Sequence, residues 1–284
     1  MAARSKRARF QSDTRTDGPP RKKMKAAESI KQQLDILAPR PILDGLPDNI
    51  MLCILSLLDI WSLIKMSRVC KRFHHLYSDE FIWNSVDLTR ESVGFKLDPR
   101  RLKNIIRLNL PKSVSRVKLS SNAFSLSSKQ PVVTESVFDL LFERCPNITS
   151  IAVHQCDMTV LSPACKLYHA IKLTHLSFVE CKSNHVWFKE INPSWPNLTH
   201  LSFEGTTMIG DSDLEYIASG LCGKSIRYLN LGGCYRISRG LLLKVCSDDL
   251  IKLKELDVRK CADEISKSQF LKNDRLKHIT IIFT

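Results

Sequence analysis

The sequence has no long apolar run. Its longest apolar stretches, such as residues 50–58, fall well short of the roughly 18 consecutive apolar residues that a membrane span needs. The first residues, Met-Ala-Ala-Arg-Ser-Lys-Arg, stay polar and enter no apolar segment, so they lack the architecture of a secretory signal. We therefore expect a protein of the nucleus and cytoplasm with no membrane partner.

Cysteine pairs with metal-ligand spacing are also missing. Ten cysteines are present, but no two are spaced as Cys-x-x-Cys, and thiols inside the cell are kept reduced. Four of them occupy one position of the repeat described below, namely Cys156, Cys181, Cys234 and Cys261. A shared repeat position indicates packing as small buried apolar groups. We expect free thiols and no metal site.

The common signatures of catalysis are absent as well. The sequence contains no glycine-rich phosphate loop, no nucleophile elbow and no His-Glu-x-x-His. We therefore expect a protein that is not an enzyme and that needs no cofactor.

Positive charge is abundant and concentrated at the N-terminus. The first 25 residues hold nine Lys or Arg against two Asp, which is half of the formal excess of +14. Residues 1–40 have too few apolar side chains to offset the entropy of ordering, so we expect a disordered basic tail. Two clusters in it resemble a bipartite nuclear localisation signal: Lys6, Arg7, Arg9, Arg21, Lys22, Lys23 and Lys25. The alternatives are a solvated tail without a role and a nonspecific contact with nucleic acid or an acidic partner.

Two short amphipathic helices are expected after Leu46. Pro47 suits the first turn of a helix, and Ile50, Ile54 and Leu58 recur four residues apart on one face. Asp59 suits the N-cap of a second helix, whose apolar residues recur at spacings of three and four through Phe73. Because so short a segment cannot bury both apolar faces, it needs a partner or a neighbouring domain.

The rest of the chain repeats at intervals of 23 to 28 residues. Leu-Thr-His-Leu-Ser-Phe at 173–178 recurs at 198–203. The general pattern is apolar-x-x-apolar-x-apolar-x-x-Cys/Thr, and it begins at Ile148, Leu173, Leu198, Ile226 and Leu253, with a partial copy at Leu276. Such lengths are typical of leucine-rich repeats, in which each unit contributes a strand and a helix or helical turn. We expect divergent first repeats at 107–110 and 114–119, a helix near 132–142, and an irregular segment at 182–197, which contains Pro193 and Pro196.

Alternation along each strand places the residues between the apolar positions on the concave wall of such an array. From that wall we select candidate substrate contacts: Tyr228, Glu255, Asp257, Arg259, His175 and His200. Any solenoid in water has a polar concave face, and repeat inheritance alone explains the two matched histidines without metal or acid–base chemistry. A basic stretch at 96–118 favours either a solvated face or a site for an acidic or phosphate-bearing substrate segment.

One segment of the chain resembles an F-box. It opens with Leu46-Pro47, continues through an aliphatic helix to Val69-Cys70-Lys71-Arg72-Phe73, and closes at Trp83; Phe73 stands where Trp is more usual. With the cysteine-containing repeats that follow, residues 44–284 resemble the F-box and leucine-rich repeat family. The resemblance implies an α/β solenoid: a disordered basic tail (1–40), a helical F-box (41–85) and a curved array (86–284) of about six to eight repeats, with a parallel sheet on the concave face.

The resemblance also implies a function. Members of this family are substrate-recognition subunits of cullin-RING (SCF-type) ubiquitin ligases: the F-box docks a small adaptor and, through it, the cullin and RING subunits. The repeats would hold a protein substrate, phosphorylated or not, for ubiquitination and proteasomal degradation. The implied adaptor contacts are Leu46, Pro47, Ile50, Ile54, Leu55, Leu58, Leu63 and Val69.

Two alternative functions remain open, and the F-box residues can be divided between adaptor contacts and anchors to the repeats. Val69, Phe73 and Trp83 are also expected to anchor the F-box to the first repeat. The main alternative function is a non-catalytic leucine-rich repeat scaffold or inhibitor that works outside a ligase. A nucleic-acid binder is the least favoured interpretation, because no aromatic residues interleave with the basic clusters of the tail.

Overall fold

The computed structural model describes residues 45–94, 97–121, 131–184, 187–220, 222–261 and 276–283. The chain divides into two compact units, Met1–Pro47 and Asp48–Thr284, and the second holds the elements described below. The basic clusters assigned to nuclear localisation lie outside the described residues. Within these six ranges, no helix has both the length and the apolar character needed to cross a bilayer.

Four short helices open the second unit. They are α2 (Asp48–Leu55), α3 (Ile60–Met66), α4 (Lys71–Tyr77) and α5 (Glu80–Trp83). Asp59 caps α3, because its carboxylate accepts hydrogen bonds from the backbone N–H groups of Trp61 and Ser62 at 2.9 and 3.0 Å.

The expectation of one second helix running through Phe73 is wrong. A turn interrupts it, and α4 starts after Cys70, whose thiol accepts from the backbone N–H of Phe73 at 3.5 Å. Before the turn, the Ser67 hydroxyl donates to the Ile64 carbonyl at 2.9 Å. Local side-chain bonds of this kind compete with helix continuation, which the spacing of apolar residues does not reveal.

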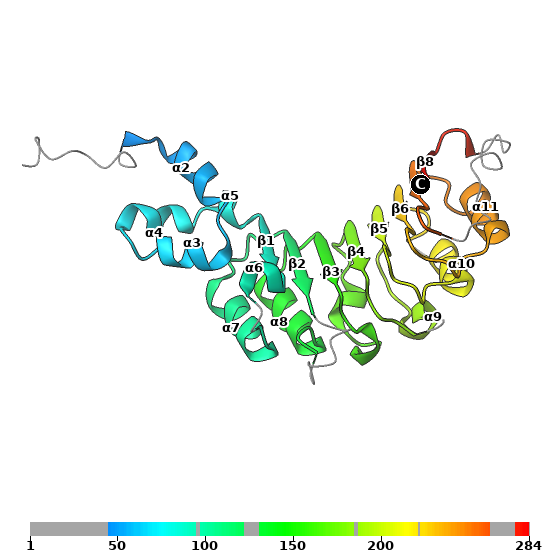
Figure 1. The fold of residues 1–284 in the computed structure, drawn as a ribbon, viewed down its shortest axis with the longest axis horizontal. Helices are drawn as coiled ribbons and strands as arrows, with labels where there is room; N and C mark the ends of the chain where they lie inside the picture. Colours follow the sequence, from blue (N-terminus) through cyan, green and yellow to red (C-terminus); the bar gives the residue numbers. More distant parts are fainter. Residues whose placement is uncertain are drawn as a thin grey trace, which may run out of the picture. The chain divides into compact units, whose positions relative to one another are not determined.

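Eight parallel strands then form one open sheet in chain order, with β1 and β8 at its edges. The strands are β1 (Ser85–Leu88), β2 (Arg116–Ser120), β3 (Ser150–His154), β4 (His175–Val179), β5 (His200–Ser202), β6 (Tyr228–Asn230), β7 (Glu255–Asp257) and β8 (Thr280–Ile282). Equivalent repeat positions pair across neighbouring strands, as Leu176 with Leu201 and Leu201 with Leu229. The strands follow one another along a curved sheet, which confirms the predicted α/β solenoid (Figure 1).

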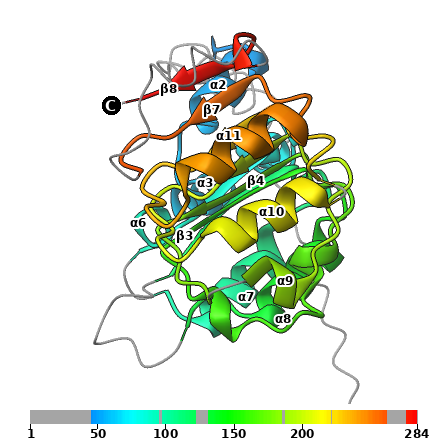
Figure 2. The same ribbon diagram turned by 90° about the vertical axis from the view of Figure 1, so that its right-hand side faces the viewer.

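Helices cover the outer face of this sheet. They are α6 (Arg90–Val93), α7 (Pro99–Asn109), α8 (Glu135–Arg144), α9 (Trp187–Ile191), α10 (Asp211–Ser219) and α11 (Arg239–Asp248), together with the 3-10 turns η2 (Met158–Val160) and η3 (Lys166–His169). Figure 1 shows α7, α8 and α9 on the outer side of the curved sheet, and Figure 2 shows α9, α10 and α11 following one another in successive layers. Among the described residues of the second unit, no helix covers the inner face of the strands.

The segment 182–197 contains a helix that the sequence did not predict. Trp187 and Phe188 of α9 are buried, and their rings contact Phe178 and Phe203 of neighbouring repeats. The carboxylate of Asp213, from the next repeat, accepts the backbone N–H of Phe188 at 3.0 Å. The two prolines follow the helix and do not interrupt it, and its support comes from a residue 25 positions away.

The expected first repeat at 107–110 is also wrong. These residues end α7, which begins after the Asp98 N-cap with Pro99 in its first turn. The first strand is instead β1, directly after the last F-box helix, and it pairs Val86 with Val117 and Leu88 with Leu119. The F-box therefore continues into the repeat sheet without an intervening linker.

Candidate functional site: an exposed apolar face on the F-box helices and a polar hollow on the sheet

The first four helices carry a concentration of exposed apolar side chains. Five of the ten exposed large apolar residues found among the described positions lie on these helices or in the turns between them: Ile50 (44%) and Ile54 (41%) on α2, Phe81 (56%) on α5, and Leu57 (85%) and Val69 (66%) in the turns that follow α2 and α3. Singly exposed apolar residues are normal, whereas such a gathering marks an interaction surface. We call these five residues the apolar face.

The core beneath the apolar face holds its helices together. Helix α2 packs on α4 and α5, and α3 packs on α4. Met51 and Leu55 point inward with 1% and 2% of their surface exposed, while Ile50 and Ile54, one position earlier in each turn, point outward.

Two predicted adaptor contacts need correction. Leu55 and Leu63 are buried at 2% and 7% exposure, so they support the surface from within and offer no area to a partner. Leu58 is half-buried. Conversely, Leu57 and Phe81 are exposed, although the resemblance to an F-box does not place them among the adaptor contacts.

Two of the three predicted anchors to the repeats are buried, and their contact with the first repeat stays a prediction. Phe73 and Trp83 are buried, and the indole N–H of Trp83 donates to the Tyr77 carbonyl. Val69 is 66% exposed, so it does not anchor the F-box to the first repeat. Trp61 does so instead, because its indole N–H donates to the carbonyl of Val93 in α6 at 2.6 Å.

An ion pair positions the start of α2. The Nε and Nη2 groups of Arg72 donate to one carboxylate oxygen of Asp48 at 2.9 and 2.7 Å. The pair is partly exposed, so its contribution to stability is small, about 0.2–1 kcal/mol. The preceding residues, half-buried Leu46 and exposed Pro47, belong to the first compact unit.

The inner face of the sheet contains a polar hollow of about 310 Å³ at β3–β6. The hollow brings together three of the predicted substrate residues. The rings of His175 and His200 stack with centroids 4.0 Å apart and 14° between their planes, and Tyr228 stacks on His200 at 5.7 Å. Small side chains, among them Ser177 and Ser202, line the same hollow.

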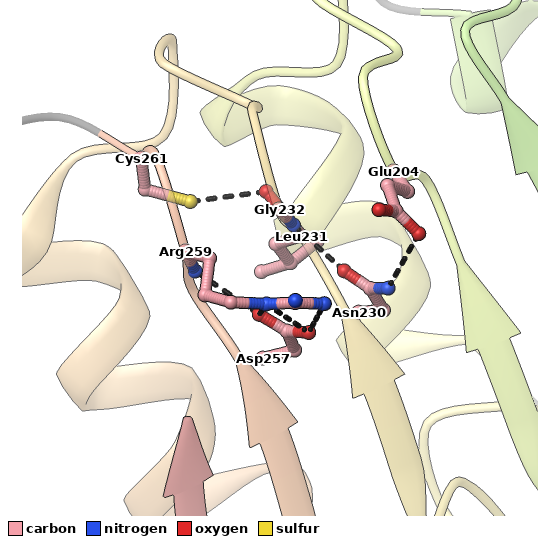
Figure 3. Close-up of polar contacts among 7 residues, drawn as sticks. All are labelled: Glu204, Asn230, Leu231, Gly232, Asp257, Arg259 and Cys261. Atoms are coloured by element: carbon pink, nitrogen blue, oxygen red, sulfur yellow. Dashed lines mark hydrogen bonds and ion pairs between the residues drawn. The ribbon is translucent and has the colours of Figure 1, made fainter. Parts of the chain in front are cut away.

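The other three predicted substrate residues lie on β7 or just after it. Arg259 is exposed and Glu255 is half-buried, but Asp257 is 1% exposed and is committed to Arg259. Asp257 is therefore a supporting residue, and its selection as a substrate contact is wrong. Figure 3 shows this pair beside Asn230, whose amide donates to a Glu204 carboxylate oxygen at 3.4 Å.

The basic stretch at 96–118 does not form one patch. Arg100, Arg101 and Arg107 lie on α7, which covers the outer side of the sheet, whereas Arg116 and Lys118 are exposed positions of strand β2. Lys96 lies outside the described residues. These basic residues are close together in sequence but do not share one surface, because a helix and a strand project their side chains to different faces.

The repeat-position cysteines serve packing. Three of the four thiols donate to backbone carbonyls of neighbouring repeats, as Cys181 to Val153 at 3.3 Å and Cys234 to Phe203 at 3.3 Å, and the Cys156 thiol donates to the His154 carbonyl at 3.2 Å. In the described part of the chain, no group of three or more His, Cys, Asp or Glu residues is arranged to hold a metal ion.

Known proteins are similar to the F-box segment and to most of the chain. The F-box-like family matches residues 43–89. The F-box/LRR-repeat protein 12 of Mus musculus and that of Homo sapiens are each 26% identical over 218 residues, covering 76% of this chain. The chain spans 63% of the length of these relatives.

Two solved structures are weakly similar to the chain. The leucine-rich repeat-containing protein LegL7 from Legionella pneumophila is 20% identical, with 73% of this chain and 71% of that chain covered and a TM-score of 0.48. A chain of the yeast Rad7 and Elc1 complex is 12% identical, with 92% and 93% covered and a TM-score of 0.37. These similarities are too low to add to the fold, which is established by the strands themselves. The chain thus joins an F-box-like segment to a parallel solenoid of repeats, and it is similar to F-box and leucine-rich repeat proteins.

Proposed function

We propose that this chain is the substrate-recognition subunit of an SCF-type ubiquitin ligase. Its F-box docks a small adaptor protein, and the inner face of its repeats holds a protein substrate for ubiquitination. The chain itself contributes no chemistry in this scheme. It raises the concentration of substrate lysines beside the ubiquitin-loaded enzyme that the cullin and RING subunits recruit.

The observation that carries this proposal is the apolar face. Half of the exposed large apolar side chains of the described residues belong to four short helices and the turns between them, where water contact is unfavourable. Specific protein interfaces place apolar and aromatic residues at a desolvated centre, and the apolar face supplies residues of both kinds.

The join between F-box and repeats supports the same function. Strand β1 follows α5 after one residue and pairs along its length with β2, and Trp61 ties α3 to α6. A rigid join sets the distance and angle between a docked adaptor and a bound substrate. Proximity catalysis depends on that geometry, because a loosely tethered substrate spends less time near the enzyme.

Adaptor binding is the direct test. We expect the full-length chain to co-elute with an SCF adaptor, and Ile54→Asp to weaken that complex at least about tenfold, because a buried unpaired carboxylate costs roughly 1.4 kcal/mol or more. Ile251→Asp is the matched control, since Ile251 is 66% exposed on the repeats and lies away from the F-box. Both variants should keep the wild-type circular dichroism spectrum.

A second measurement separates the proposal from a scaffold working outside a ligase. Affinity purification of the full-length chain from cells under proteasome inhibition should recover the adaptor together with cullin and RING subunits. A chain that folds normally but recovers none of them would contradict the proposal and favour the scaffold.

A further inference from the structure

A pocket of about 290 Å³ lies between α3 of the F-box and α7, the helix that follows β1. Both helices contribute apolar side chains to it, namely Trp61 and Ile64 from α3 and Ile105 and Leu108 from α7. Ile64 and Ile105 are buried, whereas Trp61 is half-buried and Leu108 is 74% exposed. The pocket therefore has an apolar floor and opens to the surface.

Leu108 takes no part in the core that α7 covers. The buried residues of this helix are Leu102, Ile105 and Ile106, and its exposed residues other than Leu108 are arginines and one asparagine. A single exposed leucine is ordinary on a protein surface. Here, however, the leucine continues the wall of an apolar pocket, which is the usual arrangement at a binding site.

The opposite wall of the pocket is held in place. The indole N–H of Trp61 donates to the carbonyl of Val93 at 2.6 Å, so the ring is tied to α6. A side chain that is already ordered loses little conformational entropy when a partner binds. The pocket is thus largely formed before any partner arrives.

The charge around this pocket has a single sign. Arg68 and Arg101 line the pocket, both are exposed, and no acidic residue is found among its described lining residues. The segments 60–68 and 99–109, which include α3 and α7, contain no Asp or Glu. They hold four more basic residues: Lys65, Arg100, Lys103 and Arg107.

The carboxylates that precede these two segments serve as helix caps. Asp59 accepts backbone N–H groups at the start of α3, and Asp98 accepts the backbone N–H of Arg101 at 2.8 Å at the start of α7. Even when both are counted, residues 59–68 and 98–109 hold six Lys or Arg against two Asp. An apolar pocket in such surroundings is complementary to an apolar side chain with acidic neighbours.

A whole cofactor and a nucleic acid fit this pocket less well. Its volume is at the lower end of the roughly 300–1,000 Å³ of small-molecule sites, which suits one inserted side chain. Nucleic acid binds by stacking bases on exposed aromatic rings, and half-buried Trp61 is the one aromatic residue among the described lining. The floor is instead aliphatic.

We propose that the pocket between α3 and α7 is a docking site for an acidic segment of a partner protein that inserts one large aliphatic side chain. The inserted side chain contacts Ile64, Ile105 and Leu108, and carboxylates beside it pair with Arg68 and Arg101. The pocket contains no residue of the apolar face, and the proposal does not rest on the ligase role.

Indole N–H signals give a direct readout of this pocket. The chain has four tryptophans, and Trp83, Trp187 and Trp195 are buried elsewhere with 1–2% exposed, so their signals report whether the fold is intact. In the full-length chain labelled with ¹⁵N-tryptophan, acetyl-Glu-Glu-Leu-Glu-Glu-amide should shift the Trp61 signal in a saturable way and leave the other three in place. Trp61→Phe assigns the signal. A Trp61 signal that does not move at millimolar peptide would overturn the proposal.

Three further probes test what the pocket selects. Replacing the leucine of the peptide by alanine should weaken binding several-fold, because the aliphatic side chain then buries less apolar surface. Acetyl-Lys-Lys-Leu-Lys-Lys-amide should leave the Trp61 signal in place, since its charges oppose the two arginines. Equal shifts with the acidic and basic peptides would refute the proposal. A shift with an eight-nucleotide oligothymidylate but none with the acidic peptide would refute it in favour of a nucleic-acid site.

Variants place the peptide in the pocket and exclude attraction to the basic N-terminal segment. Leu108→Ser and Arg68→Gln, both at exposed positions, should each weaken the acidic leucine peptide several-fold. Their matched controls, Ile251→Ser and Lys224→Gln, change exposed residues elsewhere on the repeats and should bind as the wild type does. Unchanged affinity in either pocket variant would overturn the proposal. Ile54→Asp should retain peptide binding, so a failure of adaptor docking and a failure of this site are told apart.

Discussion

Asp257 and Arg259 form a bidentate pair in which the carboxylate is buried and the guanidinium is exposed. Nη2 of Arg259 lies 2.6 Å from Oδ2 of Asp257, and Nε lies 3.0 and 2.9 Å from the two carboxylate oxygens. The carboxylate also accepts the backbone N–H of Arg259 at 3.1 Å. The pair holds the guanidinium in one orientation beside Asn230, at the end of β7 (Figure 3).

This pair predicts a dependence of stability on pH. Burial alone would raise the pKa of Asp257, but the hydrogen bonds and charge of Arg259 outweigh it and lower the pKa below its ordinary value. A lowered pKa in the folded state stabilises the fold above the pKa of the unfolded chain, about 3.9, and that stability is lost as the pH falls through the folded value.

The test is urea unfolding of Asp257→Asn between pH 3 and 7. We expect the variant to be less stable than the wild type at pH 7, with a gap that narrows as the pH falls below about 4. Glu190→Gln, at an exposed position of α9, should follow the wild-type curve. A gap that stays constant down to pH 3 would contradict the assignment of the pair.

Thr206 links two repeats through a buried hydroxyl. It occupies the repeat position that is Cys in four other copies, and its hydroxyl donates to the Phe178 carbonyl at 3.1 Å and accepts the Cys181 N–H at 3.2 Å. Thr206→Val leaves both groups unpaired, so we expect a loss of about 1–3 kcal/mol in the free energy of unfolding. Thr206→Cys, which retains a weak donor, should lose less, and exposed Thr207→Val should lose little. Equal stability of the two Thr206 variants would show that the hydrogen bonds are unimportant.

Substitution by alanine should change the stability of the fold in opposite directions at two glycines. Gly205 has a φ of +67°, and an added Cβ would lie 2.9 Å from Cγ of Glu180. Gly205→Ala should destabilise the fold by about 1–2 kcal/mol, the usual penalty for a left-handed residue with a side chain. Gly240, in the first turn of α11, has open space at Cβ, so Gly240→Ala should raise stability by up to about 1 kcal/mol. Thermal unfolding of both variants measures the contrast, and a stabilising Gly205→Ala would contradict the assigned backbone conformation.

Thiol reactivity should separate the F-box from the repeats. Cys53 and Cys70 are exposed, whereas burial raises the pKa of Cys181 and of Cys246 to about 12. In the native chain at pH 7, a maleimide should label the two exposed thiols at least roughly tenfold faster than the buried ones, because only the thiolate reacts and burial disfavours it. Mass spectrometry of timed digests gives the rates. Early labelling of Cys181 would indicate that the repeats open more readily than the packed structure suggests.

Much of the repeat array could be predicted from sequence. The period of 23 to 28 residues placed the strands β3 to β8 correctly, because each repeat must bury the same apolar positions against its neighbours. Departures occurred where the deciding contact is distant in sequence. Helix α9 depends on Asp213 of the next repeat, and β1 is a strand because β2 pairs with it; neither contact leaves a local pattern.

The candidate sites could likewise be predicted only where a local pattern determines them. Apolar periodicity identified the F-box helices, but it could not separate Leu55, which is buried, from Ile54, which is exposed, because both are apolar and adjacent. Alternation correctly placed His175 and Tyr228 on the inner face, yet it also placed Asp257 there as a free carboxylate. A charge that is paired and buried looks the same in sequence as one that is free.

By itself, then, the sequence indicated the family resemblance and determined the repeat period and the faces of the strands, because these depend on patterns that can be read within one chain. Tertiary structure decided which apolar residues of the F-box remain exposed, since that depends on the direction in which four short helices pack. It also decided the stacking of His175 on His200, with centroids 4.0 Å apart, because this contact forms only when β4 and β5 pair in the sheet.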